Sequence, residues 1–160
     1  MQIIDVCPDD LDEVLRLNDD SVPHVSRIDS MQMEWFASNA QYFRVARQAG
    51  KLAGFLIGLR PGLPYASPNY CWFSENYSDF GYVDRVAVAA TARRMGVASR
   101  LYQDFAEFLP REVDVMTCEV NIRPPNESSM RYHEQQGFVR VATQETDGGK
   151  KEVALMEKQL

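Results

Sequence analysis

The stretch Tyr82–Leu109, YVDRVAVAATARRMGVASRLYQDFAEFL, decides the fold of this chain. It opens with the apolar run Val86–Ala90, whose β-branched content and lack of alternation predict a strand buried on both faces. After a turn, apolar side chains recur at helical spacing, opposite a charged side that carries Arg100 and Asp104. The apolar positions of this predicted helix are Met95, Ala98, Leu101, Tyr102, Phe105, Phe108 and Leu109. The sequence therefore predicts a strand, a turn and a helix that packs on the strand.

The turn contains Arg93-Arg94-Met95-Gly96-Val97-Ala98. Small residues at Gly96 and Ala98 allow a ligand to approach the backbone, and the first-turn amides of a helix have no intrahelical acceptor. Those amides, the helix dipole and the two arginines favour an anion such as a phosphate or pyrophosphate. The alternative is an ordinary helix start in which Gly96 permits tight packing. The dinucleotide glycine pattern and the P-loop Gly-Lys-Ser/Thr are both missing, which argues against those two nucleotide folds.

The pattern Arg93-x-x-Gly96-x-Ala98 after a Val-Ala-Val strand resembles the acyl-CoA signature, Q/R-x-x-G-x-G/A, of the GNAT superfamily of N-acetyltransferases. The resemblance extends over about residues 40–160. It implies that the strand backbone runs beside the pantetheine arm of acetyl-CoA and that the amides of residues 94–99 hold the pyrophosphate. The residues assigned to the cofactor in this way are Val86, Ala87, Val88, Arg93, Arg94, Met95, Gly96, Val97, Ala98 and Ser99.

Length and composition limit the class of protein. With 160 residues, the chain fits one compact domain over residues 1–160. The net charge of −6 has the wrong sign for a nucleic-acid binder, although it suits a cationic acceptor such as an amine. Cys7, Cys71 and Cys118 lie far apart without a CxxC pair, which predicts reduced thiols and neither a disulfide framework nor a metal site. No signal peptide or membrane span is indicated, so a cytoplasmic location is expected.

Strands and helices are predicted to alternate in the order βααβββαβαββ. Pro8 with two following acids marks the start of the first helix, Asp29 or Ser30 caps the second, and Asn126 caps the last, which Gly137 ends. The other predicted strands are 2–6, 42–47, 52–59, 113–120, 138–143 and 153–158. This order is similar to the GNAT fold, and the resemblance implies a mixed, mostly antiparallel sheet of about seven strands flanked by about four helices.

The segment Arg60–Asp79 is rich in proline, glycine, asparagine and aromatic residues, and it predicts a long loop. A loop of this length in a compact domain is more often functional than idle. Its aromatic side chains either line a substrate site or pin the loop to the body of the domain.

A second motif, Asn126–Phe138, resembles the GNAT pattern N-x-x-A/S-x-x-x-Y-x-x-x-G-F. Alignment on its two ends places His133 at the family tyrosine, which is taken to protonate the departing CoA thiolate. An imidazole serves as that acid only when it is protonated or shuttles a proton. The alternatives are a packed or capping histidine, or Tyr132 as the acid if the helix is rotated. Asn126, Ser129 and His133 are assigned to the cofactor side.

The general base is the least transferable feature of the superfamily. Asp84 lies on the strand just ahead of the thioester segment, where many relatives carry a glutamate, and partial desolvation would suit a carboxylate to this task. The alternative is a structural ion pair, because Arg85 follows directly. Glu119 on the adjacent strand is the next candidate, and Glu75 in the aromatic loop is the third.

The resemblance implies a cytosolic N-acetyltransferase that transfers an acetyl group from acetyl-CoA directly to a primary amine of a small molecule or protein. A non-catalytic acyl-CoA-binding or regulatory module is the alternative, and an unrelated α/β ligand-binding domain is a third interpretation. Neither a nucleic-acid nor a membrane partner is expected. An exposed edge strand leaves a homodimer open.

Overall fold

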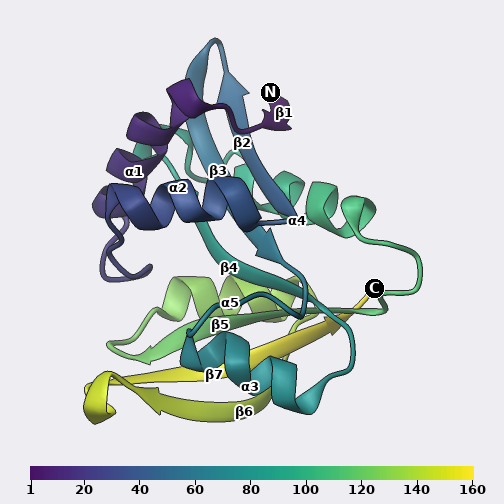
Figure 1. Ribbon diagram of the computed structural model, residues 1–160. Helices are drawn as coiled ribbons and strands as arrows, with labels where there is room; N and C mark the ends of the chain where they lie inside the picture. The colour runs from purple at the N-terminus through teal and green to yellow at the C-terminus, as the bar shows by residue number, and fades with distance from the viewer. The chain divides into compact units, whose positions relative to one another are not determined.

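The computed structural model describes residues 1–160, which divide into two compact units. The first unit contains residues 1–59 and 85–109, and the second contains residues 60–84 and 110–160. Strand β4 (Gly81–Val88) runs from the second unit into the first. Seven strands follow the order β1-β2-β3-β4-β5-β7-β6 (Figure 1), and their pairing is mostly antiparallel. The predicted mixed, mostly antiparallel seven-stranded sheet is confirmed.

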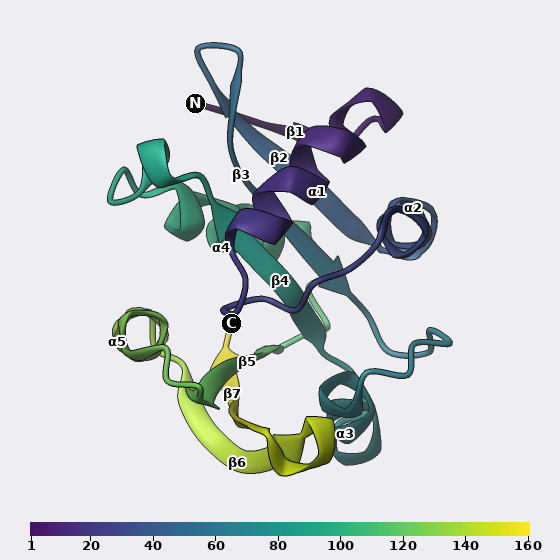
Figure 2. The same cartoon turned by 90° about the vertical axis from the view of Figure 1, so that its left-hand side faces the viewer.

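The first unit is built on an antiparallel meander. Its elements are β1 (Gln2–Asp5), α1 (Leu11–Asp20), α2 (Ser30–Asn39), β2 (Tyr42–Gln48), β3 (Lys51–Leu59) and α4 (Val97–Phe108). Figure 2 shows α1 and α2 on one side of these strands and α4 on the other. The β2–β3 turn uses Ala49 and Gly50, both at positive φ, as expected for a tight hairpin. The predicted hairpin is confirmed.

Glycines in β3 allow its neighbours to approach closely. A Cβ on Gly58 would lie 2.5 Å from two ring atoms of Phe105 on α4, and a Cβ on Gly54 would lie 2.7 Å from the carbonyl oxygen of Ala87. Real Cβ atoms do not tolerate such distances. The lack of a side chain at Gly58 and Gly54 therefore allows α4 and β4 to pack closely against β3.

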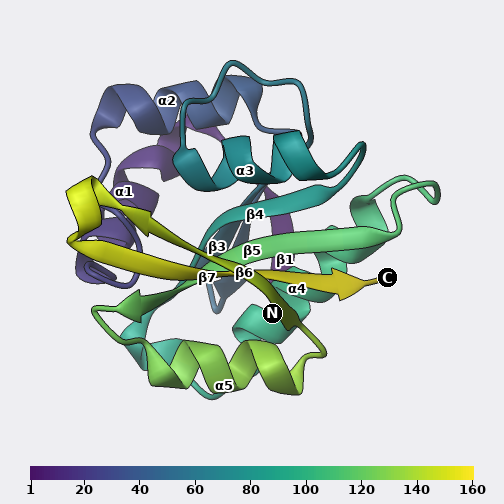
Figure 3. The same ribbon diagram turned by 90° about the horizontal axis from the view of Figure 1, so that it is seen from below.

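The second unit surrounds the C-terminal strands. Its elements besides the start of β4 are α3 (Pro68–Asn76), β5 (Val115–Arg123), α5 (Glu127–Gln135), β6 (Val139–Thr146) and β7 (Lys151–Gln159). Figure 3 shows α3 and α5 on opposite sides of these strands. β5 pairs antiparallel with β7, with Cys118 opposite Met156, and parallel with β4, with Tyr82 opposite Thr117. None of the helices in either unit is long and apolar enough to cross a bilayer.

Local capping signals identified two helix starts correctly. The Asp29 side chain accepts a hydrogen bond from the Gln32 amide at 2.8 Å, while the Gln32 side chain accepts one from the Asp29 amide at 3.0 Å. This capping box starts α2. Asn126 caps α5 by accepting from the Ser129 amide at 3.3 Å, and Gly137, at φ 89°, follows that helix.

The prediction of a loop over Arg60–Asp79 is wrong in its second half, where α3 adds a fifth helix. Ser67 caps this helix by accepting from the Tyr70 amide at 3.4 Å, and Pro68 occupies its first position. A serine followed by a proline is a recognisable helix start. The aromatic residues obscured it because they show no amphipathic periodicity.

The central strand and helix also differ from the prediction. β4 ends at Val88, and Ala90 belongs to a short 3-10 turn. The strand is not buried on both faces, because Val86 and Val88 are partly exposed whereas Ala87 is buried. Met95 lies before α4 and is 52% exposed, so it is not part of the packed helix face.

Candidate active site

The turn before α4 has an unusual backbone. Arg94 lies at φ 64° and Gly96 at φ 75°, both in the left-handed region. Gly96 is the N-cap residue of α4, and nothing lies within 4 Å of the position where its Cβ would be. Glycine adopts this conformation without strain, and it leaves open space beside the backbone at the positive end of the helix dipole. Arg93 and Arg94 are exposed on the same turn.

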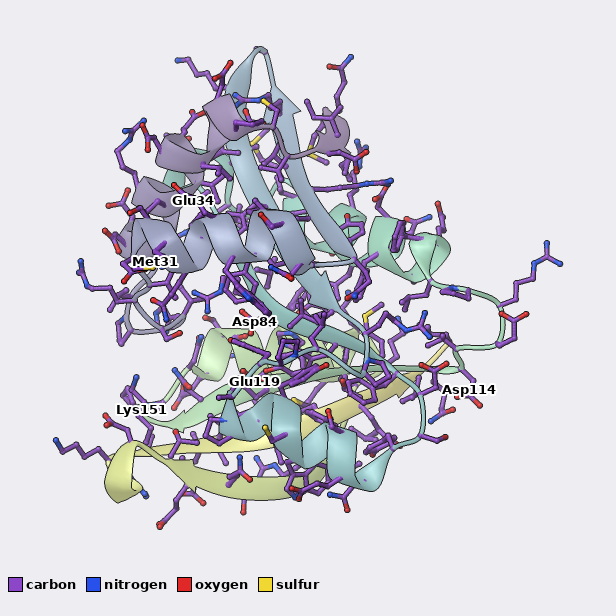
Figure 4. All side chains as sticks on the ribbon, viewed as in Figure 1. Met31, Glu34, Asp84, Asp114, Glu119 and Lys151 are labelled. Atoms are coloured by element: carbon purple, nitrogen blue, oxygen red, sulfur yellow. The ribbon has the colours of Figure 1, made fainter.

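Two phenol–carboxylate pairs lie in the second unit. The Tyr65 hydroxyl donates to Oδ1 of Asp84 at 2.6 Å, and the Tyr82 hydroxyl lies 2.9 and 2.8 Å from the two carboxylate oxygens of Glu119. Tyr82 and Asp84 share one face of β4 because they are two residues apart. Figure 4 labels Asp84 and Glu119.

The strand register explains why these two carboxylates occur together. The parallel pairing of β4 with β5 joins Gly81 to Met116 and Tyr82 to Thr117. Asp84 and Glu119 each follow two residues after the Tyr82–Thr117 pair, on the same face as that pair. Both side chains are partly exposed, so each is accessible to a ligand.

Tyr82 is fully buried, and burial raises its pKa well above the usual range. The negative charges of Glu119 and Asp84, the nearby Tyr65 and the hydrogen bond to Glu119 act in the same direction. The phenol therefore stays protonated and acts as a hydrogen-bond donor to Glu119. It orients that carboxylate and does not itself exchange protons near neutral pH.

Arg85 lies on the opposite face of β4 from Asp84. Its Nη1 donates to the Asn18 side chain at 2.9 Å and to the Ser26 carbonyl at 3.0 Å, and its guanidinium lies over the Phe36 ring at 5.2 Å from the centroid. These contacts hold the chain after α1 against β4. They give Arg85 a structural role on that face, whereas the Asp84 carboxylate accepts from Tyr65.

The motif on α5 is packed around His133. This residue is 4% exposed, and its Nδ1 lies 2.7 Å from the Ser129 carbonyl and 3.2 Å from the Ser129 hydroxyl. Its ring packs edge-on against Tyr132 and Phe138, with centroids 5.2 and 5.3 Å apart. Burial lowers the pKa of His133, although the Ser129 carbonyl acts in the opposite direction. The imidazole is therefore neutral near pH 7, while Tyr132 is partly exposed.

The segment before β4 both lines a pocket and anchors itself. The pocket has a volume of about 450 Å³ and is lined by Gly62, Leu63, Pro64, Tyr65, Tyr70, Cys71, Ser74 and Glu75. The Tyr70 hydroxyl donates to the Arg60 carbonyl at 2.7 Å and accepts from the Leu63 amide at 3.0 Å. Tyr77 donates to Glu157 on β7. The aromatic residues thus do both: Tyr65 and Tyr70 line the pocket, and Tyr70 and Tyr77 also pin the segment.

Comparison with known proteins identifies the family of this chain. The model of the acetyltransferase (GNAT) family matches residues 11–138. The chain belongs to this family. The predicted resemblance to GNAT acetyltransferases is confirmed, and the match includes the Gly96 turn, both carboxylates and the whole of the Asn126–Phe138 motif.

Solved structures support the same GNAT fold. Ard1 from Thermoplasma volcanium superposes with a TM-score of 0.79 at 20% identity, covering 99% of this chain and 97% of that one. Naa20 from Chaetomium thermophilum, in complex with a bisubstrate analogue, gives 0.77 at 18% identity, covering 100% and 87%. Ribosomal-protein-alanine N-acetyltransferase from Brucella melitensis gives 0.73 at 20% identity over all of both chains. No curated protein sequence matches significantly.

The structure joins some of the predicted site residues into groups. Val86, Ala87 and Val88 lead from Asp84 along β4, and Gly96, Val97, Ala98 and Ser99 form the start of α4. Asn126, Ser129 and His133 form a connected cluster on α5. Tyr65 and Tyr82, the partners of the two carboxylates, were missed as site residues, because the sequence does not show which distant phenol faces which acid.

Proposed function

We propose that this GNAT domain transfers an acetyl group from acetyl-CoA to a primary amine. The observation that carries the proposal is Gly96 at φ 75°, which caps α4 with open space beside its backbone in a chain that matches the family across this turn. Main-chain amides at a helix start suit a pyrophosphate. The partly exposed Val86 and Val88 supply an accessible strand for the pantetheine arm.

The reaction requires a neutral amine and a proton for the departing thiolate. The amine nitrogen attacks the thioester carbonyl, a carbon–nitrogen bond forms, and the carbon–sulfur bond breaks. Asp84 is the proposed base that accepts the amine proton, because it is partly exposed and precedes Val86 on the same strand. Glu119 is the second candidate. It is held by Tyr82 and can assist in attracting the cationic form of the amine.

Tyr132 is the better candidate for the acid that protonates the thiolate. Its ring is partly exposed, whereas His133 is buried, neutral and bound to the Ser129 carbonyl through Nδ1. In this proposal His133 positions α5 by packing between Tyr132 and Phe138. Tyr132→Phe should then lower kcat more than His133→Asn does at equal folded fraction, and the reverse order would assign the acid to His133.

Two measurements test the proposed function. Calorimetry with acetyl-CoA should show binding, and a thiol-release screen over amino acids, polyamines, aminoglycosides and peptides should identify at least one acceptor. Binding without release in the presence of any amine would favour a non-catalytic acyl-CoA-binding module. No binding at millimolar acetyl-CoA would overturn both functions.

The acceptor is a primary amine of a small molecule or a protein. Neighbouring folds include Arabidopsis thaliana NAA60 with a bisubstrate analogue, a ribosomal-protein-S18-alanine N-acetyltransferase from Escherichia coli and a putative phosphinothricin N-acetyltransferase. These proteins share the fold at 16–18% identity, so they support both kinds of acceptor equally.

A further inference from the structure

The pocket lined by residues 62–75 is separated from Asp84 by a single side chain. Tyr65 lines the pocket, and its hydroxyl donates to Asp84 at 2.6 Å. The wall of the pocket and the proposed base are therefore parts of one hydrogen-bonded unit. A molecule whose amine reaches Asp84 has this pocket immediately beside it.

The pocket offers a tyrosine ring rather than free hydroxyl groups. The Tyr65 ring is partly exposed, whereas Tyr70 is buried, with the two ring centroids 5.5 Å apart at 56°. Both hydroxyls already have partners, since Tyr65 donates to Asp84 and Tyr70 donates to the Arg60 carbonyl. Leu63 and Pro64 add further apolar lining. Such a surface accepts an alkyl chain or the face-on approach of a cation.

Glu75 supplies the only charge among the lining residues. Its side chain is exposed on α3, and the pocket has no lysine, arginine or histidine. Arg60, at the start of the segment, is directed to Asp79, with its Nη2 2.6 and 2.8 Å from the two carboxylate oxygens. A carboxylate next to aromatic faces complements a positively charged group.

From this geometry we infer that the preferred acceptor carries two cationic groups joined by an alkyl chain, as in an alkyl diamine. One amine lies beside Asp84 for acetylation, and the distal ammonium occupies the pocket between the Tyr65 ring and Glu75. This inference rests on the proposed acetyl transfer and names the substrate class for it.

Three amines of equal length test the inference. The dication 1,5-diaminopentane, the neutral-ended 5-amino-1-pentanol and the apolar-ended n-hexylamine have the same number of heavy atoms, and they differ at the distal group. With saturating acetyl-CoA, kcat/KM for thiol release should be about tenfold higher for the diamine, the size expected for a cation–π contact with a nearby carboxylate. Equal values for the three amines would overturn the inference and leave the proposed function intact.

The variant Glu75→Gln removes the charge and keeps the shape. It should raise KM for 1,5-diaminopentane several-fold, and the loss of kcat/KM should be at least several-fold larger for this diamine than for n-hexylamine. The matched control is Glu112→Gln, an exposed carboxylate of the same unit that does not line the pocket. An equal loss in both variants would show only a general effect of negative charge and would contradict the inference.

A binding measurement does not depend on turnover. Titration of the protein, loaded with CoA, with 1,5-diaminopentane should shift the ring resonances of Tyr65, assigned through Tyr65→Phe. The shifts should shrink in Glu75→Gln and be smaller with n-hexylamine. No shift with the diamine, together with thiol release from another amine, overturns the inference alone, whereas an absence of thiol release from every amine overturns the proposed function.

Discussion

Tyr65 and Asp84 are joined by a 2.6 Å hydrogen bond, although one residue precedes α3 and the other lies within β4. A phenol that donates a hydrogen bond to a carboxylate fixes the orientation of that carboxylate. Asp84 is therefore presented as an oriented acceptor, with a partly exposed side chain.

Replacement of this carboxylate should remove most of the activity. In Asp84→Asn, kcat should fall by about 100-fold, the lower end for loss of a general base, while the affinity for acetyl-CoA stays unchanged. The control is Asp114→Asn, an exposed residue before β5 that is also labelled in Figure 4. Unchanged kcat in Asp84→Asn, together with a large loss in Glu119→Gln, would move the base to Glu119.

Substitution of Gly96 can separate the effect of backbone strain on stability from an effect on acetyl-CoA binding. Gly96→Ala and Gly50→Ala both place a side chain at positive φ in open space, at 75° and 77°. Each should lower the free energy of unfolding by about 1 kcal/mol because left-handed backbone disfavours a Cβ. Only Gly96→Ala should also weaken acetyl-CoA binding, by about tenfold in calorimetry. Equal affinity in the two variants would argue against main-chain pyrophosphate binding at this turn.

Gly58 should tolerate no larger residue while Phe105 is present. A Cβ there would lie 2.5 Å from the Phe105 ring, so Gly58→Ala should destabilise the protein by about 1–3 kcal/mol through overpacking. Urea unfolding measures this change. Phe105→Leu removes part of the ring, and the double variant should lose less stability than the sum of the two single variants. Strict additivity would mean that the clash is relieved elsewhere.

His133 should make stability depend on pH. Burial lowers its pKa below the ordinary 6.5, so the unfolded chain binds the proton more tightly than the folded protein does. The resulting stability is fully present above pH 6.5 and is lost as the pH falls through the lower, folded pKa. Between about pH 7 and pH 5, His133→Gln should therefore show a shallower decline in unfolding free energy than the wild type.

The other histidine provides the comparison. His24 is exposed, and His24→Gln should retain the wild-type decline. If His24→Gln instead flattens the curve and His133→Gln does not, the buried imidazole does not control this pH range.

Much of the fold was predictable because its signals are local. The hairpin turn at Gly50, the cap at Asp29 and the cap at Asn126 each act over a few residues, and each was placed correctly. α3 was missed because its aromatic residues face the interior: Tyr70 and Phe73 are buried, and their packing outweighs the weak helical periodicity.

The candidate site was predictable only in part, because contacts between residues far apart in the chain build it. Asp84 and Glu119 were singled out by their position relative to the central strand. Their partners Tyr65 and Tyr82 lie 19 and 37 residues away from them in the chain, and only the folded strands and the α3 segment bring them together. The packing of His133 against Phe138 likewise depends on tertiary contacts.

The helix α3 carries its own start signal at Ser67-Pro68 and ends before β4 begins. Its exposed positions, such as Ser74 and Glu75, can therefore be randomised in a library while the buried Tyr70 and Phe73 keep the segment anchored. Under the proposed function, directed evolution aimed at this one helix should change which amines are acetylated and leave the affinity for acetyl-CoA unaltered.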